Sequence, residues 1–431
     1  MAMAAVNTLR LLRRAAPARF CRSVSVSAAG ACATLEPGGA VRSFKPFDLL
    51  EESGRAAVAA RDALGGAAPD VCLFFTSMAD GAKLQELPDV LYRTFGQRVL
   101  LLGGEAPPGV VGGFLQGLPA VSLLCLSLGE RARAHMLHID AAGALPTVDG
   151  LEWEDLVSRP PERSPGVVLL GSARFDPTPL LSRLDLAMPF APKVGGTLPS
   201  LALYAGGEWR SGGAAGLVLD GEVALDAVVS QGAVGLGDEL TITATDERWI
   251  TELDGLDVVD AVRQRAGVSE IPPESQLFVG VGVDSTATVG AAGVPPAAGG
   301  LSEYVVRAPI AIERERGILL PVSPELLQPG RRVRFHAFGA IQAQDELRRQ
   351  CRLLRDQLGE GQAAGALMVP CAARGMQLFG DCGVEESIVR EVLQQPDLPL
   401  AGFFAGGELG PCGLRTYTHT FTTAMAVLRA R

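Results

Sequence analysis

Features that would indicate a membrane, fibrous or nucleic-acid-binding protein are scarce in this sequence. Aromatic residues make up 5% of the 431 residues, so we expect a core built mainly from Ala, Val and Leu. Apolar residues reach 48% but form no run long enough to span a bilayer, so no transmembrane helix is expected. Lysine is scarce and the net charge is −10, which argues against a nucleic-acid partner because phosphate binding needs clustered cations.

Motifs for disulfides, cofactors and metals are also missing. The eight Cys are scattered without a C-x-x-C pair, so a disulfide framework is not expected. No phosphate-binding glycine motif and no G-x-S-x-G element occurs, and we therefore expect no cofactor. His135 and His138 form an H-x-x-H motif that can share a metal on one helix face. Because no third ligand stands nearby, we expect no metal site.

The first 45 residues differ in composition from the rest of the chain. Residues 1–35 contain five Arg and no acid, and Arg10, Arg13 and Arg14 share one arc of a helical wheel. This pattern predicts a disordered organelle transit peptide over 1–45, directed to the mitochondrial matrix or alternatively to the plastid stroma. A basic tail without a targeting role is the remaining alternative. The body is then expected to divide into residues 46–250 and 251–431.

Hydrophobic patterning in the body favours an α+β fold with mixed β-sheets flanked by helices. An α/β unit is predicted for residues 70–128. Two β-hairpins are predicted, one at 216–230 around Asp220-Gly221 and one at 239–255. The loop at 284–303 is rich in small residues and is expected to be a mobile insertion. Further strands are predicted at 331–339, 365–370 and 398–411, with helices at 257–267, 344–358 and 384–395.

One internal similarity suggests a duplicated strand–helix–strand unit. LFFTSMADG at 73–81 and LMVPCAARG at 367–375 both run from a strand to a glycine at equal spacing. Each is followed by a helix, a strand and a Gly-Gly-Glu, at 103–105 and 406–408. In this alignment Ser77 matches Cys371. Chance similarity in a glycine-rich chain is the alternative.

Two segments near the carboxyl end carry a resemblance to a known family. They are CAARG at 371–375 and LPLAGFFAGGELGP at 398–411, followed by His419. They resemble the C-x-x-R-G turn and the P-L-x-G-F-F-x-x-G-E-x-G-P segment of the FIST proteins. Residues 213–255 and RVLLLGGEAPPGVVGG are similar to earlier parts of that family, so the resemblance covers most of residues 65–425. It implies an N-terminal and a C-terminal FIST part within a sensory or recognition module.

The resemblance also implies a small ligand such as an amino acid. Some relatives carry an F-box ahead of the FIST region and select proteins for ubiquitination, but here an Arg-rich leader stands in its place. Recruitment to a cytosolic ubiquitin ligase is therefore not expected.

The turn at 371–375 contains the residues best suited to chemistry. Cys371 stands three residues before Arg374, and a nearby cation lowers the pKa of a thiol. With His336 or His419 adjacent, Cys371 is a weak candidate nucleophile. A small buried side chain at a strand end is the alternative, and no fixed base or third group supports catalysis. Cys371 and Gly375 are better candidates for lining a ligand pocket.

Opposite charges at the two turns predict a site for a zwitterion. Arg374 can pair bidentately with a carboxylate, whereas a structural ion pair, perhaps with Glu408, is the alternative. Glu408, within a glycine-rich turn that includes Gly407, can hold an ammonium group or cap backbone donors. His419 is a lone strand His that is usually only hydrogen-bonded, but it is retained as a pocket residue.

Three functions are therefore open. The favoured one is a sensing module that binds an amino acid or a carboxylate. The second is an adaptor that recognises a protein partner, and the third is a Cys371-dependent enzyme. The pocket hypothesis requires the turns at 371–375 and 402–411 to lie side by side.

Overall fold

The computed structural model describes most of the body of the chain. The described residues are 21–27, 48–77, 80–112, 115–116, 118–139, 147–149, 155, 163–265, 276–283, 304–359, 361–381 and 383–431. The insertion predicted at 284–303 and nearly all of the predicted leader lie outside them. One part of the leader segment, Cys21–Ser27, forms strand β1, which differs from the disorder predicted for residues 1–45. Among the helices described, none is long and apolar enough to cross a membrane.

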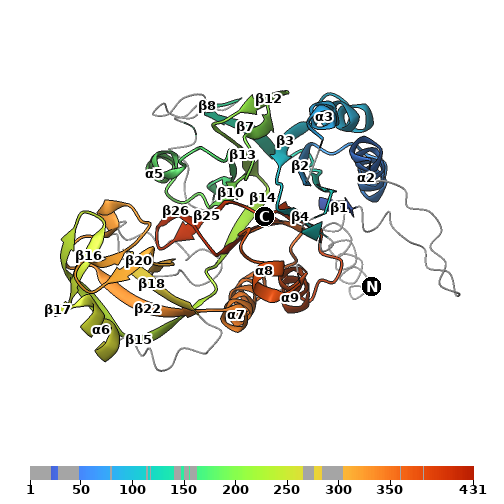
Figure 1. The fold of residues 1–431 in the computed structure, drawn as a ribbon. Coiled ribbons are helices and arrows are strands. Elements are labelled where there is room, and N and C mark those ends of the chain that lie inside the picture. The colour runs from blue at the N-terminus through green and yellow to red at the C-terminus, as the bar shows by residue number, and fades with distance from the viewer. Residues whose placement is uncertain are drawn as a thin grey trace, which may run out of the picture.

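The body contains the same arrangement of strands three times within the described residues (Figure 1). Repeat 1 consists of β1 (Cys21–Ser27), α2 (Leu49–Ala63), β2 (Val71–Ser77), α3 (Gly81–Phe95), β3 (Leu100–Glu105), the hairpin β4–β5 (Gly109–Val111 and Leu115–Gln116) and β6 (Ala120–Leu126). Repeat 2 consists of β7 (Ala132–Ile139), β8 (Thr147–Val148), β9 (Gly166–Gly171), α5 (Thr178–Ala187), β10 (Lys193–Thr197), the hairpin β11–β12 (Ala202–Ala205 and Glu208–Ser211) and β13 (Ala214–Gly221). Repeat 3 consists of β14 (Val223–Ser230), α7 (Ala340–Leu358), β23 (Gly365–Pro370), α8 (Met376–Phe379), α9 (Val384–Leu393), β24 (Leu400–Phe403), the hairpin β25–β26 (Gly407–Cys412 and Arg415–His419) and β27 (Thr423–Ala430).

The three sheets exchange their hairpins in a cycle. Their strand orders are β1-β6-β2-β3-β11-β12, β8-β7-β13-β9-β10-β25-β26 and β14-β27-β23-β24-β4-β5. Each sheet contains one parallel pair from a single repeat, β2 with β3, β9 with β10, or β23 with β24, and an antiparallel hairpin from another repeat completes the edge. Repeat 1 gives its hairpin to repeat 3, repeat 2 to repeat 1, and repeat 3 to repeat 2. The fold therefore has pseudo-threefold symmetry.

One glycine fixes the register of each parallel pair. A Cβ atom on this glycine would lie within 1.8 Å of the carbonyl oxygen opposite, so any other residue would push the two strands apart. The three contacts are Gly103 with Phe74, Gly195 with Leu169, and Gly402 with Met368. The predicted duplication is confirmed, with a third copy added. The match of the Gly-Gly-Glu segments is wrong, because the residue equivalent to Gly103 is Gly402. In the later copy the two paired strands are separated by five more residues of sequence than in the first.

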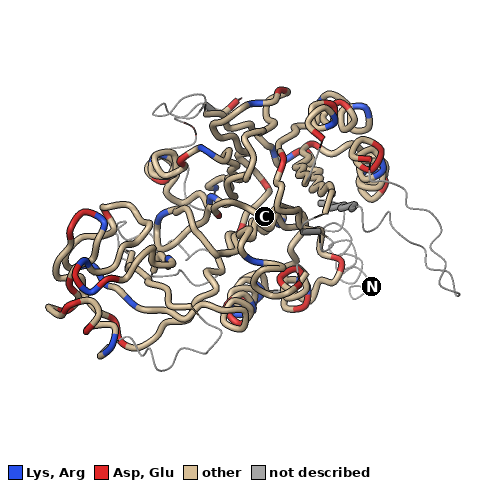
Figure 2. Tube along the Cα trace, in the orientation of Figure 1, with Lys and Arg blue, Asp and Glu red and all other residues tan. Residues whose placement is uncertain are grey.

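A central hydrophobic core lies between the inner faces of the three sheets. Phe75 of β2 stacks on Phe403 of β24 with ring centroids 4.7 Å apart, a contact that adds about 1 kcal/mol beyond its buried area. Helices cover the outer faces: α2 and α3 pack on the first sheet, α5 on the second, and α7 and α9 on the third. Figure 2 shows the strands of these sheets mainly in tan, with most charged residues on helices and outer turns. Charged side chains inside these sheets are therefore exceptions.

A separate lobe is inserted between β14 and α7 (Figure 1). It is built by β15 (Ala233–Asp246), β16 (Trp249–Leu253), β17 (Leu256–Asp257), α6 (Val258–Arg265), β18 (Gln276–Gly282), β19 (Tyr304–Arg307), β20 (Ala311–Glu313), β21 (Gly317–Leu319), the 3-10 helix η4 (Pro324–Leu326) and β22 (Arg332–Phe338). The lobe has its own apolar core. The predicted boundary between 250 and 251 falls inside β16. Sheets formed by both halves of the sequence surround the central core.

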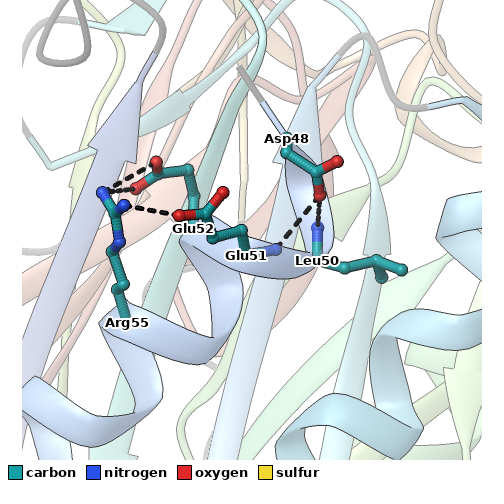
Figure 3. A network of polar contacts seen from close by, with 5 residues as sticks. All are labelled: Asp48, Leu50, Glu51, Glu52 and Arg55. Atoms are coloured by element: carbon teal, nitrogen blue, oxygen red, sulfur yellow. Dashed lines mark hydrogen bonds and ion pairs between the residues drawn. The ribbon is translucent and has the colours of Figure 1, made fainter. Parts of the chain in front are cut away.

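The start of α2 shows how local sequence begins a helix (Figure 3). The Asp48 carboxylate accepts hydrogen bonds from the backbone N–H groups of Leu50 and Glu51, at 3.0 and 3.1 Å. An N-cap of this kind stabilises a helix by about 1 kcal/mol. In the next turn Arg55 pairs with Glu51 and Glu52. These carboxylates near the N-terminus also interact favourably with the helix dipole.

One local prediction is wrong. The segment 216–230 is not a hairpin, because β13 pairs with β7 and β9 whereas β14 pairs with β27 in another sheet. Gly221 is needed for close packing, since a Cβ atom there would lie 2.1 Å from the Arg131 carbonyl oxygen. The H-x-x-H pair lies on strand β7, not on a helix. At that spacing the two side chains point to opposite faces of a strand, so His135 and His138 do not share a metal.

Candidate functional site

The two glycine-rich bends lie side by side, as the pocket hypothesis requires. Residue 371 forms a parallel bridge with Ala405, immediately beyond the ends of β23 and β24. The N–H of Ala405 donates to the Pro370 carbonyl and the N–H of Ala372 donates to the Ala405 carbonyl, each at 2.8 Å. The hairpin β25–β26 then pairs residue 408 with residue 419. The topology of repeat 3 therefore gathers residues separated by up to 48 positions.

Arg374 is fully buried and is held by an ion pair with Glu385, not with Glu408. Its Nη2 donates to Glu385 Oε1 at 2.7 Å, and the Thr423 hydroxyl donates to the same oxygen at 2.7 Å. Its Nη1 donates to the Phe421 carbonyl at 2.9 Å. The guanidinium therefore lacks the free fork that a bidentate carboxylate reader needs. Its Nε has no hydrogen-bond partner among the described residues.

Glu408 is a fully buried carboxyl beside the bend. Its Oε2 accepts a hydrogen bond from the N–H of Thr422 at 3.2 Å, whereas Oε1 has no partner in the described part of the chain. Burial raises the pKa of Glu408 to about 8, against the opposing effects of the Thr422 N–H, Cys371, Arg374 and Arg307. At neutral pH the free protein therefore holds this group mainly in its protonated form.

Cys371 lies next to Glu408 and is only 8% exposed. Burial, with a smaller contribution from the Glu408 carboxyl, raises the pKa of the Cys371 thiol well above its usual range. The expectation of a lowered thiol pKa is wrong because burial, and after it the Glu408 carboxyl, disfavours the thiolate. A thiol held in its neutral form is a poor nucleophile at neutral pH.

His419 is buried on β26 as a neutral imidazole. Burial, followed by the nearby Arg307 cation, lowers the pKa of His419 to about 3. A carbonyl oxygen can only accept, so Nε2–H donates to the Gly410 carbonyl at 3.1 Å. The other nitrogen, Nδ1, then carries a lone pair, and the described residues supply it with no donor.

The predicted glycines have structural roles. Gly375 has φ of 63°, in the left-handed region, and immediately precedes α8. A Cβ atom on Gly407 would lie 3.2 Å from the Thr418 Cγ2 atom and 3.3 Å from the Thr197 hydroxyl oxygen. Gly407 therefore allows β25 to pass closely between its neighbours. The sequence predicted that both glycines lie at the bend. It could not show whether they are needed for close packing or for contact with a ligand.

Arg307 belongs to the site and was missed by sequence reasoning. It projects from β19 of the inserted lobe, and its guanidinium donates to the carbonyl oxygens of Val306 and Thr418. Burial lowers the pKa of Arg307 to about 10, and the charge of Glu408 opposes this shift. A single Arg at the end of an apolar strand carries no recognisable motif. Only the packing of the lobe against β26 brings it to the site.

Three side chains near this junction carry a polar atom that has no hydrogen-bond partner among the described residues. Arg374 Nε, Glu408 Oε1 and His419 Nδ1 belong to side chains that are fully buried. A buried polar atom without a hydrogen bond costs roughly 1–3 kcal/mol, so buried polar atoms in native proteins are nearly always satisfied by a protein group, a water or an ion. Arg374 Nε–H can donate a hydrogen bond, His419 Nδ1 can accept one, and the protonated Glu408 carboxyl can do either. In the described part of the chain no group of His, Cys, Asp and Glu is arranged to hold a metal ion.

Comparison with known proteins identifies the family of this chain. Residues 70–256 match the family model described as the FIST N domain, and residues 256–411 match the FIST C domain. The chain belongs to the FIST family. It is 26% identical over 396 residues to the uncharacterized protein Mb0898c of Mycobacterium bovis, covering 88% of this chain and 96% of the relative. It is 25% identical over 388 residues to the uncharacterized protein MT0656 of Mycobacterium tuberculosis, with the same coverage. Family membership is consistent with a sensor domain in signal transduction.

Proposed function

We propose that this FIST protein is a sensor module that binds a small amino acid at the junction of Glu408, His419 and Arg374. The observation that carries the proposal is the set of unpartnered atoms on these three buried side chains. An amino acid offers an ammonium donor for His419 Nδ1 and Glu408, and a carboxylate acceptor for Arg374 Nε. Arg374 contributes a single N–H instead of the bidentate fork, because Glu385 occupies the rest of its guanidinium.

The charges around the junction are compatible with a zwitterion. Arg374 and Arg307 are cations and Glu385 balances one of them, so the ionised form of Glu408 brings the cluster to neutrality. An ammonium group placed beside Glu408 favours that ionised form because opposite charges stabilise each other in a buried site. Binding is therefore expected to release the proton that Glu408 holds in the free protein. Cys371 lines the site as a neutral thiol.

A thermal-shift screen tests this function. The twenty protein amino acids and simple carboxylates such as acetate are added to the wild-type protein, to Glu408→Gln and to the control Glu391→Gln, which changes an exposed residue. We expect at least one amino acid to raise the Tm of the wild type and of the control, and to leave Glu408→Gln unshifted. The proposal fails if no amino acid shifts the wild type, or if Glu408→Gln responds equally.

We also propose, from the composition of residues 1–45, that the protein is imported into the mitochondrial matrix, with the plastid stroma as the alternative. Residues 1–45 fused to a fluorescent protein are expected to direct it into the organelle. Replacing Arg10, Arg13 and Arg14 by Gln is expected to abolish import. Diffuse cytosolic fluorescence from the unaltered fusion would contradict this localisation.

A further inference from the structure

The pseudo-threefold symmetry places three equivalent residues at one end of the central core. Counting from the glycine contacts, Ser77, Ser172 and Cys371 occupy the same position at the carboxyl ends of β2, β9 and β23. The ladder continues through them: the N–H of Ser172 donates to the Gly213 carbonyl at 3.0 Å, and that of Cys371 to the Thr422 carbonyl at 2.9 Å. All three are nearly or fully buried.

Alternation along the strands shows which way these side chains face. Phe75, Leu170 and Val369, two residues earlier in each repeat, belong to the central core. Because side chains two apart point to the same face of a strand, Ser172 and Cys371 face that core as well. The ends of the second and third sheets meet here, since a Cβ atom on Gly196 would lie 2.6 Å from Val369 Cγ1.

The same symmetry shows that Glu408 is not required by the fold. Its counterparts, at the same register in the other two hairpins, are Val110 and Leu203, and both belong to the central core. The hairpin exchange seats Glu408 in the sheet of repeat 2, opposite Gly196, which in turn pairs with Leu170. Glu408 and Leu170 thus lie two strands apart, about 10 Å, on the face that Ser172 shares.

Ser172 completes the pattern of unpartnered polar atoms. Its side chain is fully buried and its Oγ finds no hydrogen-bond partner among the residues described. Ser77, the equivalent residue of repeat 1, instead donates to the Leu118 carbonyl at 2.5 Å. Symmetry thus provides three hydroxyl or thiol positions. The Ser77 hydroxyl is bonded to the backbone, whereas the Ser172 hydroxyl has no partner among the described residues and faces the central core two residues beyond Leu170, which is level with Glu408.

We propose that Ser172 is a ligand-binding residue, which extends the amino-acid site of Glu408 and His419 from repeat 3 into repeat 2. This inference rests on the proposed function. A ligand held by both repeats would bridge two sheets that also meet through the exchanged hairpin and the central core. Such a ligand would make the packing of repeat 2 against repeat 3 depend on its binding, which is a property that a sensor needs.

Paired serine and threonine variants test this inference. Thr76 is the matched control, because its hydroxyl is also buried and unpartnered but lies one residue before the strand end, on the face covered by α2 and α3. The affinities of the twenty amino acids are measured by calorimetry for the wild type, Ser172→Ala, Ser172→Cys, Thr76→Val and Glu408→Gln. Urea denaturation of each variant checks that it folds.

The expected result is a roughly tenfold loss of affinity in Ser172→Ala, with Thr76→Val equal to the wild type, because a hydrogen bond to a charged ligand group is removed only in the first. Ser172→Cys should retain part of the affinity, since a thiol is a weaker donor of similar size. An affinity in Ser172→Ala within twofold of the wild type, together with loss of binding in Glu408→Gln, would overturn the role of Ser172 while leaving the proposed function intact. Absence of binding to the wild type would overturn both.

Discussion

Replacing Glu408 by Gln is expected to change how the stability of the protein depends on pH. The wild-type carboxyl is buried, one of its oxygens has no hydrogen-bond partner among the described residues, and its pKa is raised from 4.5 to about 8. Between these values the folded protein retains a proton that the unfolded chain has lost. Stability must therefore fall as pH rises through this interval, by about 1.4 kcal/mol per unit of pH, and level off above the folded pKa. Gln cannot titrate, so the variant lacks this slope.

The opposite sign applies to His419. Its pKa is lowered to about 3, so between that value and 6.5 the unfolded chain holds the extra proton and stability rises with pH. The two effects overlap between 4.5 and 6.5, where they largely cancel. Comparing Glu408→Gln with the wild type removes the His419 contribution, because both proteins carry it. The free-energy difference between variant and wild type should shift by about 2 kcal/mol in favour of the variant from pH 6 to pH 8.

Urea denaturation of both proteins at pH 6, 7 and 8 measures this difference. Glu391→Gln, which alters an exposed carboxyl, serves as the control and should follow the wild type. A constant difference between Glu408→Gln and the wild type across this range would refute the reasoning. It would mean that Glu408 ionises equally in the folded and unfolded states and that water reaches it.

Three further predictions follow from named contacts. Iodoacetamide should modify Cys371 much more slowly in the folded protein at pH 7.5 than in urea, because its thiol is buried and its pKa is raised; mass spectrometry of the labelled peptide shows equal rates if this is incorrect. Glu385→Ala should lower the free energy of unfolding by about 3–5 kcal/mol because it leaves Arg374 buried without its carboxylate; a loss below about 1 kcal/mol in urea titrations would contradict the buried ion pair. Gly402→Ala should cost at least about 3 kcal/mol, since its Cβ atom would lie 1.8 Å from the Met368 carbonyl oxygen; a soluble variant with the wild-type Tm would show that the strands are further apart.

Much of the central architecture could be predicted from the sequence because its strands are short apolar runs bounded by glycines. The strand 71–75 and the helix 384–395 were placed to within a few residues. The second repeat was missed because it shares a register and one glycine with the others, not a run of similar residues. The exchange of hairpins between sheets could not be predicted from the sequence either. A strand pair such as β25–β26 looks the same in sequence whichever sheet it joins, and its edge partner is decided by long-range packing.

The juxtaposition of the two bends was predicted from the sequence, but the contacts of their side chains were only partly predicted. The motif showed which bends to join, and the structure brings them together. The partner of Arg374 was missed because Glu385 is one of two acids in the first turn of a helix, where acids are common. Burial decided the remaining differences, since it raises the pKa of Cys371 where a nearby cation had suggested the reverse. Whether these side chains bind a ligand stays a prediction.

Proton release on ligand binding tests the central claim most directly. The wild-type protein is titrated with the twenty amino acids by calorimetry at pH 7, in phosphate and in Tris, whose ionisation heats differ. If a zwitterion binds beside Glu408, the two buffers should give binding heats that differ by close to one released proton per bound ligand, because the carboxyl changes from protonated to ionised. Equal heats in the two buffers, or no binding heat with any amino acid, would contradict the account.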